Sequence, residues 1–263
     1  MAELCPLYSG STGNSYFIGS KTGGVLVDIG RSARQTVNIL KRCAIDPLAV
    51  CGILVTHEHS DHVGGLRVFA SKYNIPVFAS AGTLAALESM RVLDGSFPAY
   101  EIDGTLSLDG MHIDAFRTPH DCAESLGFRI QTADGRVVTV ATDLGRVTPE
   151  IEAHLFGADC AVIESNHDVG MLRTGPYPYA LKRRILSDCG HLSNVACSEL
   201  LPELYASGTK RFLLAHLSRE NNTPDIARQT AVCGMQMAGV ENEGDYILDV
   251  APVENLDGHC LEF

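Results

Sequence analysis

The sequence has no apolar run of the roughly 18 residues that a membrane-spanning helix needs, so we expect no membrane-spanning segment. The first ten residues, MAELCPLYSG, contain neither a basic cluster nor an apolar stretch, which argues against a secretory signal. We therefore expect a cytoplasmic protein that does not act at a membrane.

Basic residues are scarce. The sequence contains 20 lysines and arginines and 32 aspartates and glutamates, which gives a net charge of -12. A strongly acidic surface repels polyanions at long range, so a nucleic-acid substrate would require a local basic patch or a metal. The composition counts against nucleic acid as a partner without excluding it.

The nine cysteines form no C-x-x-C pair, and their number is odd. Neither a disulfide framework nor a thiolate zinc knuckle is expected from this spacing. We expect small, reduced core residues. They are Cys5, Cys43, Cys51, Cys122, Cys160, Cys189, Cys197, Cys233 and Cys260.

The 263 residues, with 45% hydrophobic and 20% charged side chains, have an ordinary globular composition and can bury a full core. No low-complexity linker divides the chain. Strands and helices alternate in both halves, which predicts an α/β fold with two sheets packed face to face and helices outside, as one domain over residues 1–263.

Hydrophobic periodicity and turn residues place the expected elements. We expect strands at 14–19, 24–30, 50–56, 75–80, 105–120 (two, around Asp109-Gly110), 124–143 (a hairpin at Asp134-Gly135), 159–165, 211–218 and 246–252. We expect helices at 32–43, 63–73, 83–90, 149–157, 177–190 (ended by Gly190), 193–208 (capped by Ser193 or Asn194) and 223–239.

The stretch VTHEHSDHVGG directly follows a predicted buried strand and concentrates metal-binding side chains. Histidine nitrogens and carboxylate oxygens suit zinc, manganese or iron. A solvated loop would rarely collect so many of these groups by chance, and two glycines allow close backbone approach. The candidate ligands are His57, His59, Asp61 and His62, whereas Glu58 and Ser60 are expected to face away.

This stretch resembles the signature T-H-x-H-x-D-H-x-G-G of the metallo-β-lactamase superfamily and matches every fixed position. The resemblance implies a four-layer αβ/βα sandwich with a two-metal site at the sheet edges. It also implies three further ligands, each after a predicted strand: His120 in FRTPHD, Asp143 in VVTVATDLG and His216 in RFLLAHLS.

By this resemblance, two divalent transition-metal ions (zinc, manganese or iron) are the expected cofactors. One would be held by His57, His59 and His120, the other by Asp61, His62 and His216, with Asp143 bridging them. The set leaves room for a shared hydroxide, as a catalytic site requires. Asp61 is also a candidate for orienting or deprotonating the attacking water.

The stretch DCGHLSN resembles the tRNA 3'-processing endonucleases of the superfamily, in which a histidine before a helix donates a proton to the leaving oxygen. The resemblance gives this role to His191, supported by Glu164 in CAVIESNHD. A carboxylate that orients an imidazole and keeps it charged suits a general acid. A polar loop histidine is the alternative.

The strings LYSGSTGNSYFIG and AHLSRENNTPDIA are similar to one bacterial group of the superfamily, the YycJ (WalJ) type, from about Leu4 to Ala227. This similarity implies a DNA exonuclease that degrades duplex DNA from a 5' end in repair. Side chains of the first string could bind phosphate, or the string could be a plain turn. These are Ser9, Ser11, Asn14 and Ser15.

Other polar residues have less definite roles. Lys182, Arg183 and Arg184 could form a phosphate-contact patch or an ordinary solvated helix face. Weaker candidates for phosphate contact are Arg31, Arg34, Arg173 and Arg219. We expect His112, His154 and His259 to be surface or hydrogen-bonded residues, and the role of His167 is open.

The sequence therefore predicts a dinuclear metal-dependent phosphodiesterase, most specifically a DNA exonuclease. One alternative is a small-molecule hydrolase, such as a cyclic phosphodiesterase or a thioesterase of the glyoxalase II kind, which the net charge of -12 favours. Another is a metal-binding regulatory protein without turnover. Metal identity, DNA against RNA, cleavage polarity and oligomeric state stay open.

Overall fold

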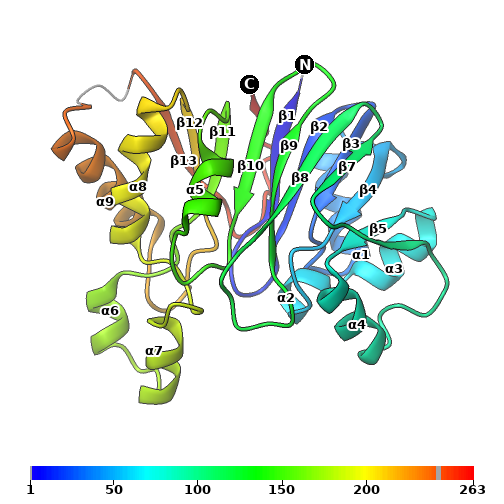
Figure 1. The fold of residues 1–263 in the computed structure, drawn as a ribbon, viewed down its shortest axis with the longest axis horizontal. Helices are drawn as coiled ribbons and strands as arrows, with labels where there is room; N and C mark the ends of the chain where they lie inside the picture. The colour runs from blue at the N-terminus through cyan, green and yellow to red at the C-terminus, as the bar shows by residue number, and fades with distance from the viewer. Residues whose placement is uncertain (1, 241–243) are drawn as a thin grey trace. The chain divides into compact units, whose positions relative to one another are not determined.

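The computed structural model describes residues 2–240 and 244–263 and divides the chain into two compact units. Unit 1 comprises the described residues of Met1–Ala115, Cys122–Arg136 and Pro252–Phe263, and unit 2 those of Phe116–Asp121 and Val137–Ala251. Each unit contains strands and helices (Figure 1). The single domain over residues 1–263 stays a prediction.

Unit 1 contains a seven-stranded sheet in the order β14-β1-β2-β3-β4-β5-β6, antiparallel from β14 to β3 and parallel from β3 to β6. The strands are β1 (Glu3–Tyr8), β2 (Ser15–Ser20), β3 (Gly23–Val27), β4 (Val50–Leu54), β5 (Val77–Ala79), β6 (Ala99–Glu101) and β14 (Leu261–Glu262). The unit also contains β7 (Thr105–Leu108) and β9 (Leu126–Gln131), while β8 (Met111–Arg117) begins in unit 1 and ends in unit 2.

The helices of unit 1 cover its sheet through a shared apolar core. Ile39 and Leu40 of α1 (Ala33–Arg42) and Phe69 of α3 (Leu66–Tyr73) pack with Phe17 and Ile53 from the strands. Leu87 of α4 (Ala81–Ser89) belongs to the same cluster. A short 3-10 turn, η1 (Pro47–Ala49), and the single-turn α2 (Ser60–Val63) complete the unit.

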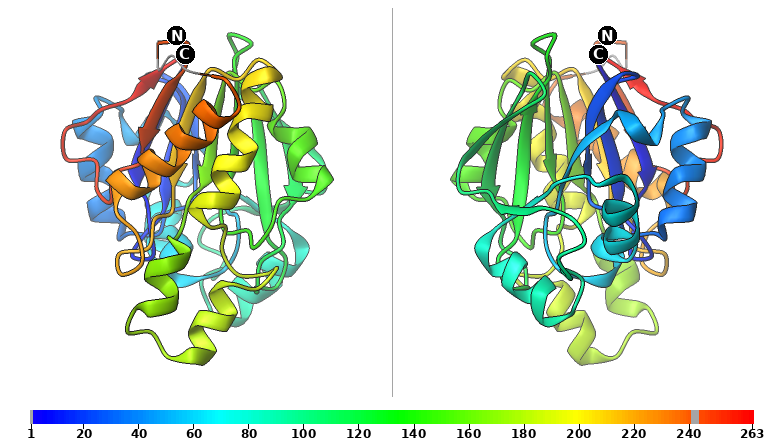
Figure 2. Two further views of the ribbon diagram at one scale, coloured as in Figure 1. Left: turned by 90° about the vertical axis from the view of Figure 1, so that its left-hand side faces the viewer. Right: turned by 90° about the vertical axis from the view of Figure 1, so that its right-hand side faces the viewer.

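Unit 2 contains four parallel strands in the order β13-β12-β11-β10. They are β10 (Val137–Ala141), β11 (Cys160–Glu164), β12 (Arg211–Ala215) and β13 (Ile247–Val250), and the helices are α5 (Pro149–Leu155), α6 (Val169–Thr174), α7 (Tyr179–Ile185), α8 (Asn194–Ala206) and α9 (Pro224–Met237). Leu201, Leu204 and Met235 pack α8 and α9 against Ile163 and Leu214 of the strands (Figures 1 and 2).

The strand ends place the polar residues. Parallel strands bring their carboxyl ends to one edge of a sheet. In unit 1, Asp28 follows β3 and His57 follows β4. In unit 2, Asp143 follows β10, Glu164 ends β11 and His216 follows β12. The loop edge of each sheet therefore carries groups that can bind or react.

Most expected elements are present, with two kinds of difference. The helix predicted to run to Gly190 ends at Ile185. Gly190 instead lies so close to the backbone that an added Cβ would be 2.3 Å from the carbonyl oxygens of Arg184 and Ile185. The elements β1, β6, β14 and α6 were not predicted, because they are short or, as in ELCPLY, lack strict alternation.

Among the described residues, no helix combines the length and apolarity needed to cross a membrane. The cytoplasmic location inferred from the sequence stays a prediction.

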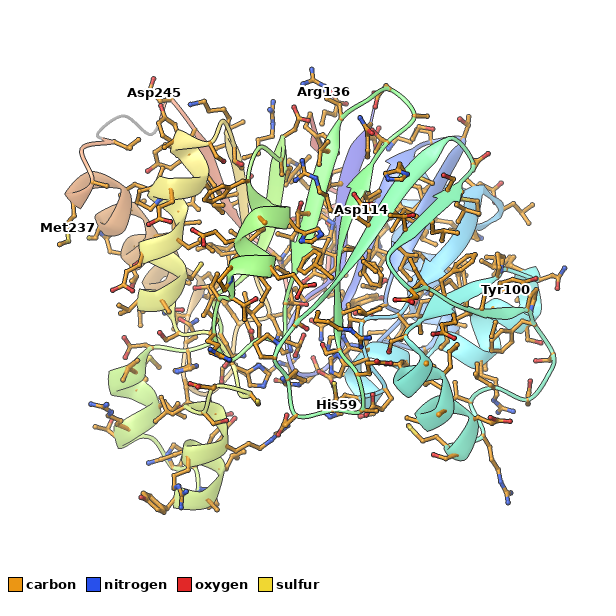
Figure 3. All side chains as sticks on the ribbon, viewed as in Figure 1. His59, Tyr100, Asp114, Arg136, Met237 and Asp245 are labelled. Atoms are coloured by element: carbon orange, nitrogen blue, oxygen red, sulfur yellow. A yellow bond between two sulfur atoms is a disulfide. The ribbon has the colours of Figure 1, made fainter. Side chains whose placement is uncertain are left out.

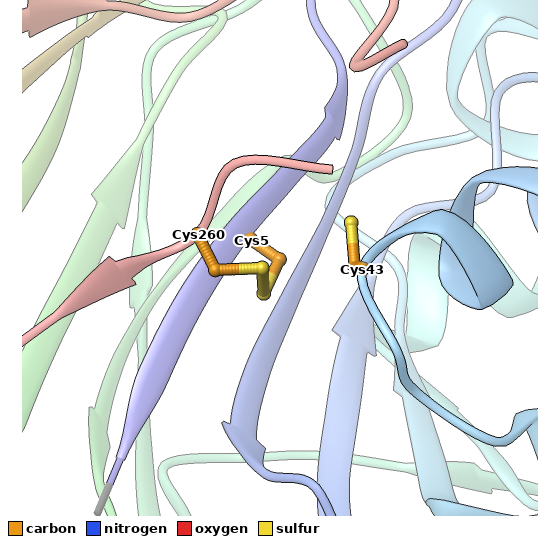
Figure 4. Close-up of side chains that lie close together, drawn as sticks. All are labelled: Cys5, Cys43 and Cys260. Carbon is orange, nitrogen blue, oxygen red and sulfur yellow. A yellow bond between two sulfur atoms is a disulfide. The ribbon is translucent and has the colours of Figure 1, made fainter. Parts of the chain in front are cut away.

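The expectation that all nine cysteines are reduced is wrong for one pair. Cys5 in β1 and Cys260 before β14 form a disulfide that joins residues 255 apart (Figure 4). The other seven are free, as predicted. Cys43 lies beside the pair, with all three sulfurs within 4.8 Å of one another. The chain order could not reveal this pairing because antiparallel β1 and β14 bring the two ends together.

Replacing Cys260 by serine should lower the free energy of unfolding by about 2–4 kcal/mol, because the disulfide restricts the unfolded chain. Denaturant unfolding under non-reducing conditions measures this loss. The exposed free thiol Cys233 provides the matched control, since Cys233→Ser should leave the midpoint unchanged. Equal midpoints for both variants would show that the disulfide does not stabilise the fold.

Candidate metal centre

Four of the predicted ligands lie together in unit 1, where the chain leaves β4 and enters α2. The rings of His57 and His59 have centroids 4.5 Å apart, and those of His57 and His62 are 4.1 Å apart. His57 and His62 are fully buried. The Asp61 side chain is 23% exposed, and its Oδ2 lies 3.6 Å from Nε2 of His62.

Asp28, which sequence reasoning missed, orients this group. Its Oδ2 accepts hydrogen bonds from Nδ1 of His62 at 2.7 Å and from Oγ1 of Thr56 at 2.8 Å, and its Oδ1 accepts one from the Thr56 amide. Burial raises the pKa of Asp28, and the charge and hydrogen bonds of His62 and Thr56 oppose that rise. A proton on Nδ1 leaves a lone pair on Nε2 of His62, which can bind a metal or accept a hydrogen bond from Nδ2 of Asn14.

The Ser/Gly-rich string supports the ligand loop instead of offering its polar groups to solvent. Nδ2 of Asn14 lies 3.0 Å from Nε2 of His62 and 3.3 Å from Oδ2 of Asp61. Ser15 donates to the carbonyl of Asp28, and Ser9 bonds to the Tyr16 hydroxyl. Of the four candidates for phosphate contact, only Ser11 is exposed.

Gly30 makes the close approach of these segments possible. A Cβ at this position would lie 1.8 Å from the carbonyl oxygen of Asp61 and 2.5 Å from the amide nitrogen of Asn14. Any larger residue would separate the string from the ligand loop.

In unit 2, one atom from each of Asp143, Glu164, His191 and His216 lies within 4.8 Å of the others. Nδ1 of His191 is 2.7 Å from Oε1 of Glu164, and Nδ1 of His216 is 3.1 Å from the same oxygen. Nδ1 of His216 also lies 3.3 Å from Oδ1 of Asp143. Asp143 and His216 both have φ of 56°, a left-handed conformation that turns each side chain sharply out of its strand.

Glu164 is fully buried and serves both imidazoles. Burial alone would raise its pKa, but the charges and hydrogen bonds of His191 and His216 outweigh burial and hold the pKa below its ordinary value. The carboxylate therefore stays ionised and fixes both rings through Nδ1. The predicted contact between Glu164 and His191 is present.

His120 lies in the same unit, with its ring centroid 5.1 Å from that of His191. Its Nδ1 is 3.1 Å from the carbonyl oxygen of Gly190, and its Nε2 is 3.9 Å from Oδ1 of Asp143. Burial lowers the pKa of His120, which favours the neutral imidazole that a metal requires.

The donor chemistry fits a divalent metal. His57, His62, His120 and His216 each have Nδ1 close to a protein oxygen, so Nε2 is the nitrogen directed to a ligand. Such outer hydrogen bonds are usual for metal-binding histidines. The donors are nitrogen and oxygen without sulfur, which suits zinc, manganese or iron.

Two buried asparagines give the strings GHLSN and HLSRENN a structural role. The carboxamides of Asn194 and Asn222 pair reciprocally through two hydrogen bonds of 2.9 Å. Asn222 also donates to the carbonyls of Ser165 and Asn166, and Asn166 donates to the carbonyl of His216 at 2.8 Å. The pair thus ties together the loops that carry His191, Glu164 and His216.

The remaining candidate residues are either bonded to other protein groups or exposed to solvent. Lys182 donates to two backbone carbonyls, and Arg184 forms an ion pair with Asp121, whereas Arg183 is exposed. His112 pairs with Asp114, His154 stacks on Phe116, and the His259 amide bonds to Asn255, as expected. Arg31 bonds to Thr12, while Arg34, Arg173 and Arg219 are exposed.

His167 is 1% exposed, and its ring nitrogens have no hydrogen-bond partner among the described residues. Burial lowers its pKa to about 4, so the ring is neutral at ordinary pH. Its carbonyl accepts a hydrogen bond from the Asn194 amide. The backbone thus belongs to the asparagine network, and the role of the ring stays open.

Comparisons with known proteins agree with this chemistry. A model of the beta-lactamase superfamily domain matches residues 24–217. Exodeoxyribonuclease YycJ of Bacillus anthracis is 38% identical over 229 residues, 85% of each chain. Exodeoxyribonuclease WalJ of Streptococcus pneumoniae serotype 2 (strain D39 / NCTC 7466) is 36% identical over 251 residues, 94% of this chain and 93% of the relative.

Among solved structures, Zn²⁺-bound PqqB from Methylobacterium extorquens matches with a TM-score of 0.74 and 18% identity over all of both chains. Identity at this level speaks for the fold alone. The predicted α/β class, the four-layer αβ/βα sandwich, is confirmed.

Replacing Asp28 by alanine should weaken divalent-metal binding by about 10- to 100-fold, because His62 loses the hydrogen bond that orients it. Metal retention during dialysis against a graded chelator measures the change. The exposed Asp103 gives the control variant Asp103→Ala. If Asp28→Ala retained metal as the wild type does, Asp28 would not be needed to orient His62.

Asn194→Ala and Asn222→Ala should each cost about 1–3 kcal/mol, because each leaves a buried carboxamide unpaired. The double variant should cost less than the sum of the two, since one loss already breaks the pair. Denaturant unfolding of the wild type, the two single variants and the double variant gives the coupling free energy between the two asparagines. Asn38→Ala, at an exposed position, is the control. Strict additivity would show that the pair does not act as a unit.

Proposed function

The chain belongs to the beta-lactamase superfamily of metal-dependent hydrolases, and we propose that it is an exonuclease that degrades duplex DNA from a 5' end in repair. Because the chain belongs to a superfamily of hydrolases and contains every candidate ligand, we do not favour the alternative of a regulatory protein without turnover. The relatives named exodeoxyribonuclease support DNA as the substrate.

The observation that carries the proposal is the contact of 2.7 Å between His191 and Glu164. The departing alkoxide of a DNA phosphodiester is a poor leaving group, so cleavage gains from a positioned acid. A thioester releases a thiolate, which needs no such proton. An imidazole fixed by a buried carboxylate therefore favours a phosphodiester over a thioester.

We propose that the seven candidate ligands hold two divalent cations. One cation would use His57, His59 and His120, the other would use Asp61, His62 and His216, and Asp143 would serve both. When bound, the cations neutralise charge on phosphoryl oxygens and acidify a water molecule. The nitrogen and oxygen donors accept zinc, manganese or iron, and they do not choose among the three metals.

The protein groups have separate tasks in this proposal. Glu164 accepts the hydrogen bond from Nδ1–H of His191 and stabilises the charged ring. The protonated Nε2 of His191 then gives its proton to the departing oxygen. Asp61, whose Oδ2 lies 3.3 Å from Nδ2 of Asn14, orients the attacking water.

A small-molecule hydrolase is the second candidate, favoured by the net charge of -12. Metal-supplemented digestion of end-labelled duplex DNA, single-stranded DNA and RNA, beside a cyclic phosphodiester, a bis-aryl phosphate and an acyl thioester, distinguishes the two. Turnover of the thioester or the cyclic phosphodiester with intact nucleic acids would overturn the nuclease proposal.

His191→Ala should leave metal content intact and reduce DNA turnover by about 10²- to 10⁴-fold, because the leaving oxygen loses its acid. Turnover of an activated bis-aryl phosphate should fall far less, since its leaving group needs no proton. The exposed histidine control is His112→Ala. Equal losses on both substrates would rule out the acid role.

A further inference from the structure

The helices α6 and α7 form a separate lobe of unit 2 between β11 and α8. In Figures 1 and 2 the two helices project beyond the sheet on the side where β11 ends, whereas α8 and α9 lie along the strands. We call residues 169–190 the α6–α7 lobe. Leu172 of α6 and Ile185 of α7 are buried, but among the described residues neither belongs to the large apolar cluster of unit 2, so packing of that cluster does not explain the lobe.

The lobe has the opposite charge to the rest of the chain. It contains four basic residues and one acidic residue, a net charge of +3, in a protein whose net charge is -12. The basic residues are Arg173, Lys182, Arg183 and Arg184, and the acidic residue is Asp188. An ordinary solvated helix face carries the two signs in similar numbers, so the excess of positive charge here suggests a polyanionic partner.

Two of these cations build the lobe and connect it to the catalytic loops. Nζ of Lys182 donates to the carbonyls of Arg173 and Gly175 at 2.8 and 2.7 Å, which ties α7 to α6. Arg184 makes a two-point ion pair with Asp121, the neighbour of His120, with one contact of 2.8 Å between Nη2 and Oδ1. The lobe is thereby fixed relative to His120.

The other two cations and one aromatic ring face solvent. Arg173 and Arg183 are exposed, and Tyr179 at the start of α7 is 76% exposed. Tyr179 and Arg183 are four residues apart on α7 and so share one face of the helix. Proteins bind strands of nucleic acid with exposed aromatic rings that stack on bases and with cations that contact phosphates.

The lobe leads directly into the proposed acid. The amide of His191 donates to the carbonyl of Ile185, the last residue of α7, at 3.0 Å. The carboxyl end of α7 therefore lies next to His191, and a strand that runs along α7 from Tyr179 towards Ile185 would lead to it.

We infer that the α6–α7 lobe is a docking surface for a DNA strand, with Arg173 and Arg183 at phosphates and Tyr179 stacked on a base. This inference rests on the proposed nuclease function and names the surface that overcomes the net negative charge. The exposed residues of the lobe determine affinity for DNA and take no part in bond cleavage.

Binding of labelled DNA to the metal-loaded full chain, in a His191→Ala background that slows cutting, tests the proposed docking surface. Tyr179→Ala should weaken binding about 5- to 100-fold, and Tyr179→Phe should bind as the parent does, because the ring is retained. Arg173→Ala with Arg183→Ala should weaken binding and lower the slope of log affinity against log salt by about two.

The control is Arg228→Ala on α9, which removes one arginine from unit 2 outside the lobe and should leave the slope unchanged. In otherwise wild-type protein, all these variants should hydrolyse a bis-aryl phosphate normally. The proposed docking surface would be overturned if the lobe variants bound DNA as tightly as the parent does, or if the parent did not bind DNA. Absence of diester cleavage by the wild-type protein would instead overturn the proposed function.

Discussion

The candidate ligands of each unit depend on one repeated interaction: a protein oxygen close to Nδ1 of an imidazole. Asp28 bonds to His62, Thr56 lies at His57, Gly190 at His120, and Glu164 at both His191 and His216. Each contact favours one tautomer and limits rotation of the ring. The same arrangement serves two chemistries, since Nε2 with a lone pair can bind a cation and Nε2 with a proton can act as an acid.

The sheets make that repetition possible. His57, Asp143, Glu164 and His216 all lie where a parallel strand ends, so the backbone that carries them is fixed by ladder hydrogen bonds. The left-handed conformations of Asp143 and His216 turn their side chains away from the strand direction at once. A rigid sheet thus carries functional groups on very short loops, which limits their freedom without any large supporting structure.

The sequence pointed to the candidate ligands and to the pairing of Glu164 with His191, but it missed most of the groups that support them. It named Asn14 only as a possible phosphate contact. The histidines and carboxylates follow apolar strands in recognisable strings, so their chain positions could be deduced. Asp28, Asn14 and the pair of Asn194 and Asn222 act through contacts across 28 to 48 positions, which one sequence does not display. An acid at the end of VLVD was the available signal for Asp28.

The disulfide between Cys5 and Cys260 closes residues 5–260 into a covalent ring. A protease that cuts once inside this ring opens it without releasing a fragment, so both halves of the chain stay attached. Loss of material would require two cuts or a reductant. A nicked protein would keep its full mass until thiols were added, and its strands could stay in place around the break.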